Sequence, residues 1–465
     1  MLRSRRFVFT EEDIMEILCG SDSDEDENRF NLDDEDVNFL EEDGEVGTEV
    51  IIDDILSTPS TSTNMAASVC VEPIAEVSLD KNVKFIWRSA RNYQSPNYVS
   101  PTVEYGEVKI PAALEEEVPS VFQVFSEVCD FEELLKLIIE QTHIYAQQKG
   151  VAFSTNVQEL KAFFGIILGM TIHKLPDIRL YWSTLPIYHV GFIANVMPRK
   201  RFEMIRSMLH FANNNTQVSR DDPTYDRAFK IRPIINHINV AFDKALSNTK
   251  TQSIDEHMVK FKGKNSMKQY MKDKPISWGF KLWCRCDAET GYLFQTDIYT
   301  GKREKRQVGI GESVVLQMSE VLANKGIEIY FDNFFSSPIL FHKLMEKGIK
   351  ACGTVRVNRS HMPKFNPDST FKRGDFSSFQ SNGVTVVKWM DNRAVHIASN
   401  FLDPNETITV KRRQAGNPNK ISVQCPAIIK KYNTGMGGVD LMDQKKVNFI
   451  SFRNFSNFFC FSVLL

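Results

Sequence analysis

Three aspartates lie at positions in the chain where carboxylates can take part in metal-dependent chemistry. Asp255 lies within an alternating apolar and polar run, Asp332 directly follows a short apolar run, and Asp440 follows a glycine-rich segment, with Asp443 three residues later. Divalent cations such as Mg²⁺ prefer oxygen ligands, and two ions roughly 3.5–4 Å apart can hold the attacking and leaving oxygens of a phosphoryl displacement. Taken singly, each aspartate is more often a turn residue or a helix cap. A phosphoryl-transfer site therefore requires a fold that brings them together.

The elements that would position these aspartates follow one another in an informative order. We expect strands over 253–261, 280–286 and 292–299, a helix over 314–322, a strand over 327–331, a helix over 338–347 and a strand over 351–357. This is the order of an RNase H-like α/β domain, in which the first strand lies at the sheet centre and the next parallel strand flanks it. Asp255 and Asp332 would then be neighbours, and a helix opening near Asp440 can complete the group.

Segments of other types precede and interrupt this pattern. Residues 118–252 show apolar residues at helical spacing, with Asp130 and either Thr155 or Asn156 as N-cap candidates. Residues 361–425 combine short β runs with Gly, Asn, Asp and Pro, which predicts a β-rich insertion. The predicted fold class is α/β: an RNase H-like catalytic core, split into 253–360 and the third-acid helix at 426–448, preceded by a mostly helical region.

The charge of the chain is divided between an acidic N-terminal segment and a basic body. Residues 1–60 carry 20 acidic and 4 basic residues, a balance of −16, and the remainder has a balance of +13 within the net charge of −3. Repulsion between like charges predicts a disordered acidic tail over 1–60, and the Ser-, Thr- and Pro-dotted sequence predicts a linker over 61–117. Local docking of Trp87 is an alternative to an ordinary linker. The basic body favours a polyanionic partner, although lysine-rich solvated surfaces are common.

The cysteines and the apolar runs indicate the cellular compartment in which the protein is expected. Eight cysteines are dispersed along the chain, which fits reduced thiols better than a disulfide framework. Cys284 and Cys286 share a strand face, but no second pair follows, so we interpret them as small buried apolar residues rather than zinc ligands. The chain has neither the apolar leader of a signal peptide nor a run of 18 apolar residues. We therefore expect a soluble, intracellular protein without a membrane span.

A group of lysines follows the first aspartate closely. Its members are Lys260, Lys262, Lys264, Lys268, Lys272 and Lys274. They are candidates for phosphate contacts that position duplex DNA, and the first three alternate as if they shared one strand face. The alternative is a solvated strand edge protected by lysines. Trp278 can stack on a flipped base, but core packing is the more common role of such a residue.

The motifs around the aspartates carry a family resemblance. Residues 253–264 (SIDEHMVKFKGK), with Lys274-Pro275 and 279–281, resemble the first-acid motif of piggyBac transposases. Residues 330–337 (YFDNFFSS) are similar to the second-acid motif, and 353–356 (GTVR) to the strand that follows it. Residues 432–444, with MGGVDLMDQ at their end, are similar to the third. The resemblance covers about residues 118–448, with the motifs in the family's order and spacing.

This resemblance implies a fold and an activity. Asp255, Asp332 and Asp440 would be a catalytic triad of metal ligands, with Asp443 as a fourth acid, and two Mg²⁺ or Mn²⁺ ions would be the cofactors. Family members excise elements at TTAA sites, using water and then a 3′-hydroxyl as nucleophile, so double-stranded DNA is the expected partner. The helical region 118–252 would serve dimerisation and DNA binding, and we expect a homodimer in the nucleus.

The resemblance fades after residue 448. In the family the third-acid helix continues into further dimerisation helix and usually into a Cys-rich zinc-binding tail. Here residues 449–465 form a divergent Phe-rich tail in which Cys460 is the single cysteine, whereas a structural zinc site takes four ligands. The expectation is a C-terminally truncated member whose catalytic acids are intact and whose transposition is impaired.

Three functions stay open at this point. The first is a transposase core that cuts and joins DNA strands at TTAA sites, and the intact aspartates favour it. The second is a domesticated, transposase-derived DNA-binding protein without transposition activity, which the divergent end favours. The third is an RNase H-like nuclease unrelated to transposition, and the motif match outside the acids argues against it.

Overall fold

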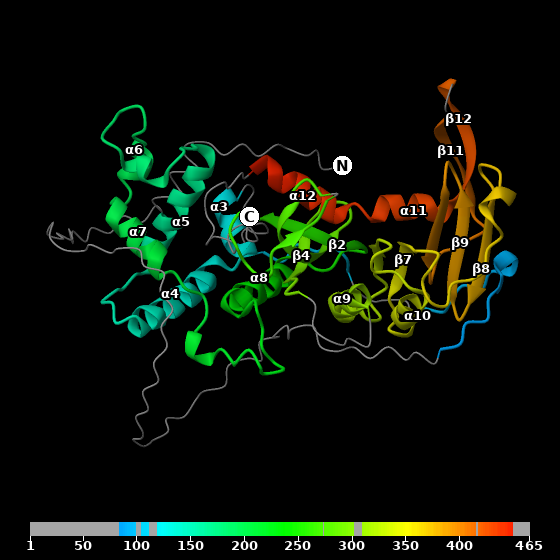
Figure 1. Ribbon diagram of the computed structural model, residues 1–465, viewed down its shortest axis with the longest axis horizontal. Coiled ribbons are helices and arrows are strands. Elements are labelled where there is room, and N and C mark those ends of the chain that lie inside the picture. The colour runs from blue at the N-terminus through cyan, green and yellow to red at the C-terminus, as the bar shows by residue number, and fades with distance from the viewer. Residues whose placement is uncertain are drawn as a thin grey trace, which may run out of the picture.

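The computed structural model describes residues 83–98, 104–110, 119–272, 274–301, 309–414 and 417–449. The acidic tail 1–60 and the divergent residues 450–465 lie outside these ranges. Figure 1 shows α3 to α7 gathered at one end of the molecule, β8, β9, β11 and β12 at the other, and β2 and β4 between them. None of the described helices combines the length and the apolar content needed to cross a membrane.

The helical region forms its own apolar core ahead of the sheet. Its helices are α3 (Val121–Val128), α4 (Phe131–Gln148), α5 (Val157–Ile172), α6 (Gly191–Ala194), α7 (Arg199–Met208) and α8 (Arg232–Ala245), with 3-10 turns η2 (Ile178–Trp182), η3 (Asn214–Thr216) and η4 (Phe229–Ile231). Asn156 caps α5 by accepting a hydrogen bond from Glu159 N. Asp130 occupies the N-cap position of α4, but in a left-handed conformation and without a side-chain cap bond.

Helix α8 joins this region to the sheet. Ile234 and Ile238 pack in the helical core, while Ile235 packs with the sheet residues. The buried Asn239 amide donates to Thr296 O and accepts from Thr296 N, which fixes α8 on β5. The helical region is therefore attached to the sheet through buried contacts.

Ten strands of the described residues form one large mixed sheet. They are β1 (Arg88–Ser89), β2 (Thr251–Lys260), β3 (Gln269–Tyr270), β4 (Trp278–Asp287), β5 (Leu293–Ile298), β6 (Glu328–Phe331), β7 (Lys350–Thr354), β8 (Phe376–Ser381), β9 (Val384–Met390) and β10 (Ala394–Ser399). Their order is β1-β8-β9-β10-β7-β6-β2-β4-β3, and β5 also pairs with β4.

The centre of this sheet confirms the predicted RNase H-like arrangement. Strand β2 pairs antiparallel with β4 on one side and parallel with β6 on the other, and β6 pairs parallel with β7. The parallel pairs require crossover connections. These are α9 (Ile310–Ser319) with η5 (Glu320–Leu322) before β6, and α10 (Pro338–Glu346) between β6 and β7.

Helices cover both faces of the sheet centre, because its strands are apolar on both faces. Ile329 and Phe331 pack in the cluster that contains residues of α9 and α10, whereas Tyr330 between them packs with Ile428 and Ile429 of α11 (Ala427–Gly435). Helix α11 contacts β2 and β6, and α12 (Gly438–Phe449) contacts β2 and β4. The third-acid helix therefore lies over the strand that carries the first acid.

The predicted β-rich insertion is present, but part of it continues the central sheet. Strand β10 pairs antiparallel with β7, and β9 and β8 follow outward. The 3-10 turn η6 (Asp368–Thr370) precedes β8. Only β11 (Thr407–Gln414) and β12 (Asn417–Pro426) form a separate two-stranded ribbon.

The predicted linker departs further from expectation. Residues 88–89 form β1 on the outer edge of β8, followed by η1 (Ala90–Asn92) with Ala90 buried. Trp87 Nε1 donates to His361 O at 2.8 Å, and Tyr98 OH donates to Asn400 O at 3.1 Å. The interpretation of this stretch as an ordinary linker was wrong for residues 83–98, which dock as a strap along the sheet edge.

Candidate active site

Asp255 and Asp332 are neighbours because of the parallel pairing between β2 and β6. In the register of that pair Ile254 lies opposite Phe331, so each aspartate is the next residue toward the carboxyl end of its strand. The side chain of Asp255 is 13% exposed. Asp255 Oδ1 accepts from Glu256 N at 2.8 Å, and Asp332 Oδ1 accepts from Phe334 N at 2.7 Å. Local backbone donors thus hold both carboxyl groups at one edge of the sheet.

Helix α12 carries the other two acids onto the same strands. Its approach is close, since a Cβ at Gly438 would lie 2.5 Å from Asp287 O and 2.6 Å from Ser253 Oγ. Val439 is fully buried against the β2–β4 face, which leaves Asp440 exposed at the helix start. Asp443 forms an ion pair with His257, which lies on β2 two residues after Asp255. The glycine therefore permits the contact that brings Asp440 and Asp443 to the strand of the first acid.

Lys274 connects the acids of the strand with those of the helix. Its Nζ lies 3.8 Å from Asp255 Oδ2 and donates to Glu256 O at 3.1 Å. Burial acts to lower the pKa of Lys274, but the charges of Asp255, Glu256, Asp440 and Asp443 outweigh it and raise that pKa. Two of these carboxylates belong to β2 and two to α12. The charges of both sets of acids therefore favour the protonated form of this ammonium group.

The folded structure disfavours the ionised forms of the Asp255 and Asp332 carboxyl groups. Burial raises the pKa of Asp255 to about 7; Lys274 opposes this change, while the charges of Glu256 and Asp332 add to it. The pKa of Asp332 is also raised, mainly by burial and then by Glu256, against the Phe334 N–H and Arg356. Desolvated carboxylates that repel one another are a common feature of sites that bind a cation or catalyse a reaction.

Sequence reasoning did not find several residues around these acids. Buried Lys281 has its Nζ 3.7 Å from Glu256 Oε2 and 4.1 Å from the Trp283 ring centroid. Tyr432 of α11, whose pKa burial raises to about 12, interacts electrostatically with Asp332 and Asp255. A lysine in a strand and a tyrosine in a helix give no local signal of this role. The signals that could have drawn attention to Lys281 and Tyr432 are their places in the first-acid motif (279–281) and the third-acid motif (432–444).

The donor set fits divalent metal ions. Among the described residues, no three Asp, Glu, His or Cys side chains stand close enough together, as placed, to hold an ion. Mg²⁺ in phosphoryl-transfer sites is commonly held by one or two carboxylates, with water and substrate phosphate completing the octahedron. Asp255 and Asp332 supply two hard oxygen donors on adjacent strands, and Asp440 and Asp443 lie on α12, which packs on β2. Their assignment as metal ligands stays a prediction.

The lysine group divides into two kinds. Strand β2 ends at Lys260, so Lys262 and Lys264 lie in the following loop, and the predicted common strand face is wrong. The physical reason is the turn at Gly263, where Lys268 Nζ donates to the Lys262 and Gly263 carbonyls. Lys260, Lys262, Lys264 and Lys272 are exposed and can meet phosphates. Lys274 instead turns inward to the acids.

Two further predictions concern side-chain burial. Cys284 and Cys286 are both buried, as the sequence indicated. Trp278 is 54% exposed, so the expectation of core packing was wrong. Strand β4 begins at this residue, and its side chain precedes the part of the strand that is covered on both faces.

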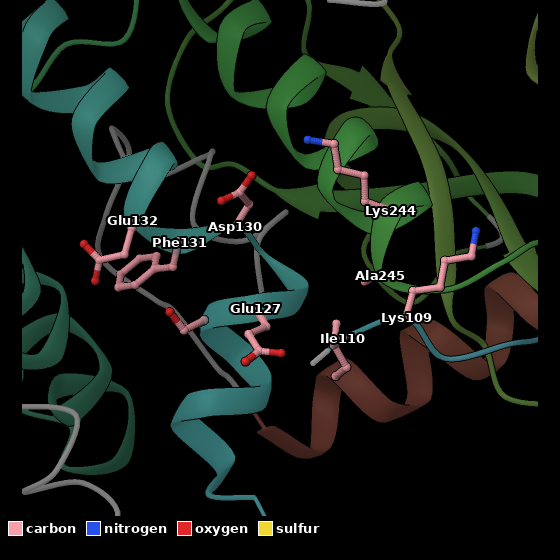
Figure 2. A pocket seen from close by; sticks show the side chains of 9 residues that line it. Lys109, Ile110, Glu127, Asp130, Phe131, Glu132, Lys244 and Ala245 are labelled. Carbon is pink, nitrogen blue, oxygen red and sulfur yellow. The ribbon is translucent and has the colours of Figure 1, made fainter. Parts of the chain in front are cut away.

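A hollow in the helical region is separate from the acids. It measures about 390 Å³ and is lined by residues of the 109–110 segment and of α3, α4 and α8. Figure 2 shows Glu127, Asp130 and Glu132 on one side of it and Lys109 and Lys244 on the other. It shares no residue with the acid group, and its mixed charges favour no one class of ligand.

Comparison with known proteins accords with this geometry. Human piggyBac transposable element-derived protein 3 is 35% identical over 67% of this chain and 54% of its own length. Human piggyBac transposable element-derived protein 2 is 33% identical over 67% of this chain and 54% of its own length. The chain spans about half the length of these curated relatives.

The fold has a counterpart of known structure. A piggyBac transposase, solved by cryo-electron microscopy in a synaptic complex with hairpin DNA, superposes with a TM-score of 0.62 at 21% identity, over 78% of this chain and 74% of that one. The sequence model of the transposase IS4 family matches residues 122–453, which include all four aspartates. This chain therefore belongs to the transposase IS4 family, as a piggyBac-type member.

Proposed function

We propose that the chain is the core of a DNA transposase that cuts and joins DNA strands at TTAA sites with divalent metal ions. The observation that carries this proposal is the parallel β2–β6 register that makes Asp255 and Asp332 neighbours, together with α12, the helix of Asp440 and Asp443, packed on β2. Support comes from the family match and from the similar transposase whose structure contains hairpin DNA. We further propose a nuclear homodimer, in which the helical region contributes to DNA binding.

Asp255, Asp332 and Asp440 would hold two Mg²⁺ or Mn²⁺ ions, with Asp443 beside them. When bound, the ions supply Lewis acidity that stabilises charge on the attacking and leaving oxygens of the phosphoryl group. Ion pairing to His257 holds Asp443 at β2. Lys274 balances the acids and can donate hydrogen bonds to a phosphate oxygen.

The proposed reaction has two displacements at phosphorus. In the first, water attacks the phosphodiester and the bond to the 3′ oxygen breaks, which leaves a 3′-hydroxyl. In the second, that hydroxyl attacks a phosphodiester at the TTAA site, so one bond to phosphorus forms as another breaks. Exposed Lys260, Lys262 and Lys264 would contact phosphates near the site and position the duplex without reading its sequence.

The test is a strand-cleavage assay on DNA bearing the element ends next to TTAA, taken from the sequence flanking this gene. Cleavage should require Mg²⁺ or Mn²⁺ and should be lost in Asp332→Asn, which keeps the acceptor for Phe334 N. Glu320→Gln, on an exposed 3-10 turn of the same domain, is the matched control and should cleave normally. Cleavage that persists in Asp332→Asn would overturn the assignment.

A second candidate is a domesticated DNA-binding protein without transposition activity. The specific observation in its favour is that relatives 35% and 33% identical are transposable element-derived proteins of the human genome. The same assay separates the two: duplex binding without metal-dependent cleavage by the unaltered chain supports the second candidate. The flanking genomic sequence gives an independent test, because a mobile element carries inverted repeats bounded by TTAA.

A further inference from the structure

Two aromatic side chains project from the sheet where its central strands end. Tyr270 of β3 is 55% exposed and Trp278 of β4 is 54% exposed. They are directly opposite each other in the antiparallel pair, with ring centroids 4.8 Å apart and ring planes 41° apart. Paired aromatic rings stabilise a β-hairpin, but an exposure above one half leaves much of both ring surfaces in water. The pair, which we call the aromatic platform, is therefore open to a ligand.

Local contacts hold the platform in place. Lys268 Nζ lies 5.3 Å from the centroid of the Trp278 ring and donates to the Lys262 and Gly263 carbonyls. Phe261 N donates to Trp278 O, and the Phe261 and Phe280 rings pack with centroids 4.7 Å apart. The preceding loop is thus fastened to the hairpin. A surface ordered in advance loses little entropy when it binds a flat partner.

The charge around the platform selects the class of partner. Residues 260–278 contain six lysines and a single acid, Asp273. Lys260, Lys262, Lys264 and Lys272 are exposed, and Lys260 lies opposite Gly279, next to Trp278, in the β2–β4 register. Aromatic rings among exposed lysines match unpaired nucleic acid, whose bases stack while its phosphates meet the cations. An acidic or purely apolar partner would leave one of these two features unused.

The platform is coupled to the acid group through one hairpin. The segment between Tyr270 and Trp278 contains Lys274, whose Nζ lies 3.8 Å from Asp255 Oδ2. Along β2, Lys260 follows Asp255 by five residues, about 17 Å at the rise of an extended strand. That length corresponds to about five nucleotide steps of B-form DNA. A strand cut at the acids therefore has its nearby nucleotides within reach of the platform.

We propose that Tyr270 and Trp278 form a stacking site for unpaired bases of the DNA next to the cut. This inference rests on the proposed function, since it names the DNA structure that the active site receives. The rings hold bases that have left the duplex, and the neighbouring lysines hold their phosphates. The protein would thus prefer DNA with unpaired nucleotides over a fully paired duplex.

The test measures binding of the full chain, by fluorescence anisotropy, to a paired duplex and to the same duplex with a short unpaired thymidine extension. Trp278→Leu keeps an apolar side chain but removes the aromatic face, and Trp278→Phe restores a ring. We expect Trp278→Leu to weaken binding of the extended DNA by roughly fivefold to tenfold. Binding of the paired duplex should change little, and Trp278→Phe should recover most of the loss. Val321→Ala, at another exposed apolar side chain, is the matched control.

Each outcome separates the inference from the function on which it rests. An unaltered chain that binds neither DNA contradicts the proposed function itself. Equal binding of both DNAs by the unaltered chain, or full retention of the preference in Trp278→Leu, overturns the stacking site alone. Equal weakening of both DNAs in Trp278→Leu would make Trp278 a duplex contact and would also overturn it. Quenching of tryptophan fluorescence by the thymidine extension, present in the unaltered chain and lost in Trp278→Phe, provides a second readout.

Discussion

Replacing Asp255 by asparagine should stabilise the protein in the absence of metal while abolishing the proposed strand cleavage. Burial and the neighbouring charges of Glu256 and Asp332 raise the pKa of Asp255 to about 7, so its ionised form is disfavoured in the folded state. Asparagine has the same shape and keeps an oxygen that can accept from Glu256 N. The substitution removes the buried charge without opening a cavity.

The magnitude follows from linkage between protonation and folding. The pKa rises from an ordinary 3.8 to about 7 in the folded state. The folded state therefore binds this proton more tightly than the unfolded state, and stability falls as pH rises between these two values. Above pH 7 the ionised group lowers the free energy of unfolding by at most about 4 kcal/mol, and at pH 5 by less than half as much.

Urea denaturation of the unaltered chain and of Asp255→Asn, with a chelator present, measures the effect at pH 5 and pH 8. The variant should gain more stability at pH 8 than at pH 5, by up to about 3 kcal/mol. Added Mn²⁺ should stabilise the unaltered chain and have less effect on the variant. An equal change at both pH values, or a variant less stable at pH 8, would refute the reasoning.

Three other perturbations test separate parts of the structure. Neutralising Lys262 and Lys264 together to Gln should weaken binding to all duplex sequences alike and lower the salt slope by about 1.8 if each meets one phosphate; a change confined to one sequence would make them base-reading residues. Asp297→Ala leaves partly buried Arg232 with one fewer partner and should lower the free energy of unfolding by about 3 kcal/mol, measured in urea. Ala90→Asp puts a charge at a fully buried position and should release residues 83–98, measured as faster protease cleavage there; unchanged cleavage would contradict a docked strap.

The fold centre was predictable from sequence because its signals are local. An alternating run predicted β2 and an apolar run predicted β6. Gly348 indicated the end of α10, and the acidic residues in the first turn of α4 indicated its start. The strap 83–98 was not predictable in the same way. In its strand β1, Arg88 pairs with Gln380. Neither segment has a sequence pattern that predicts pairing with a strand so far away in the chain.

The candidate site shows the same division. The aspartates could be named because each stands in a recognisable motif within or next to a predictable element. The sequence could not show that Lys274 faces inward while its neighbours are exposed, because all six lysines belong to the same lysine-rich segment. Its position depends on the β3–β4 hairpin folding back to Asp255, a contact 19 residues apart in the chain. The exposure of Trp278 likewise depends on tertiary packing, which buries the rest of β4 but not its first residue.

The central claim, that the acids of β2, β6 and α12 form one metal-dependent active site, can be tested by anomalous diffraction from Mn²⁺-soaked crystals of the protein bound to DNA. The account predicts Mn²⁺ coordinated by Asp255 and Asp332, with Asp440 supplying a further oxygen. If a second ion binds, it should lie roughly 3.5–4 Å from the first, as two-metal phosphoryl transfer requires. Mn²⁺ bound only elsewhere, for example at Glu127 and Asp130 of the hollow, with none at these aspartates, would contradict it.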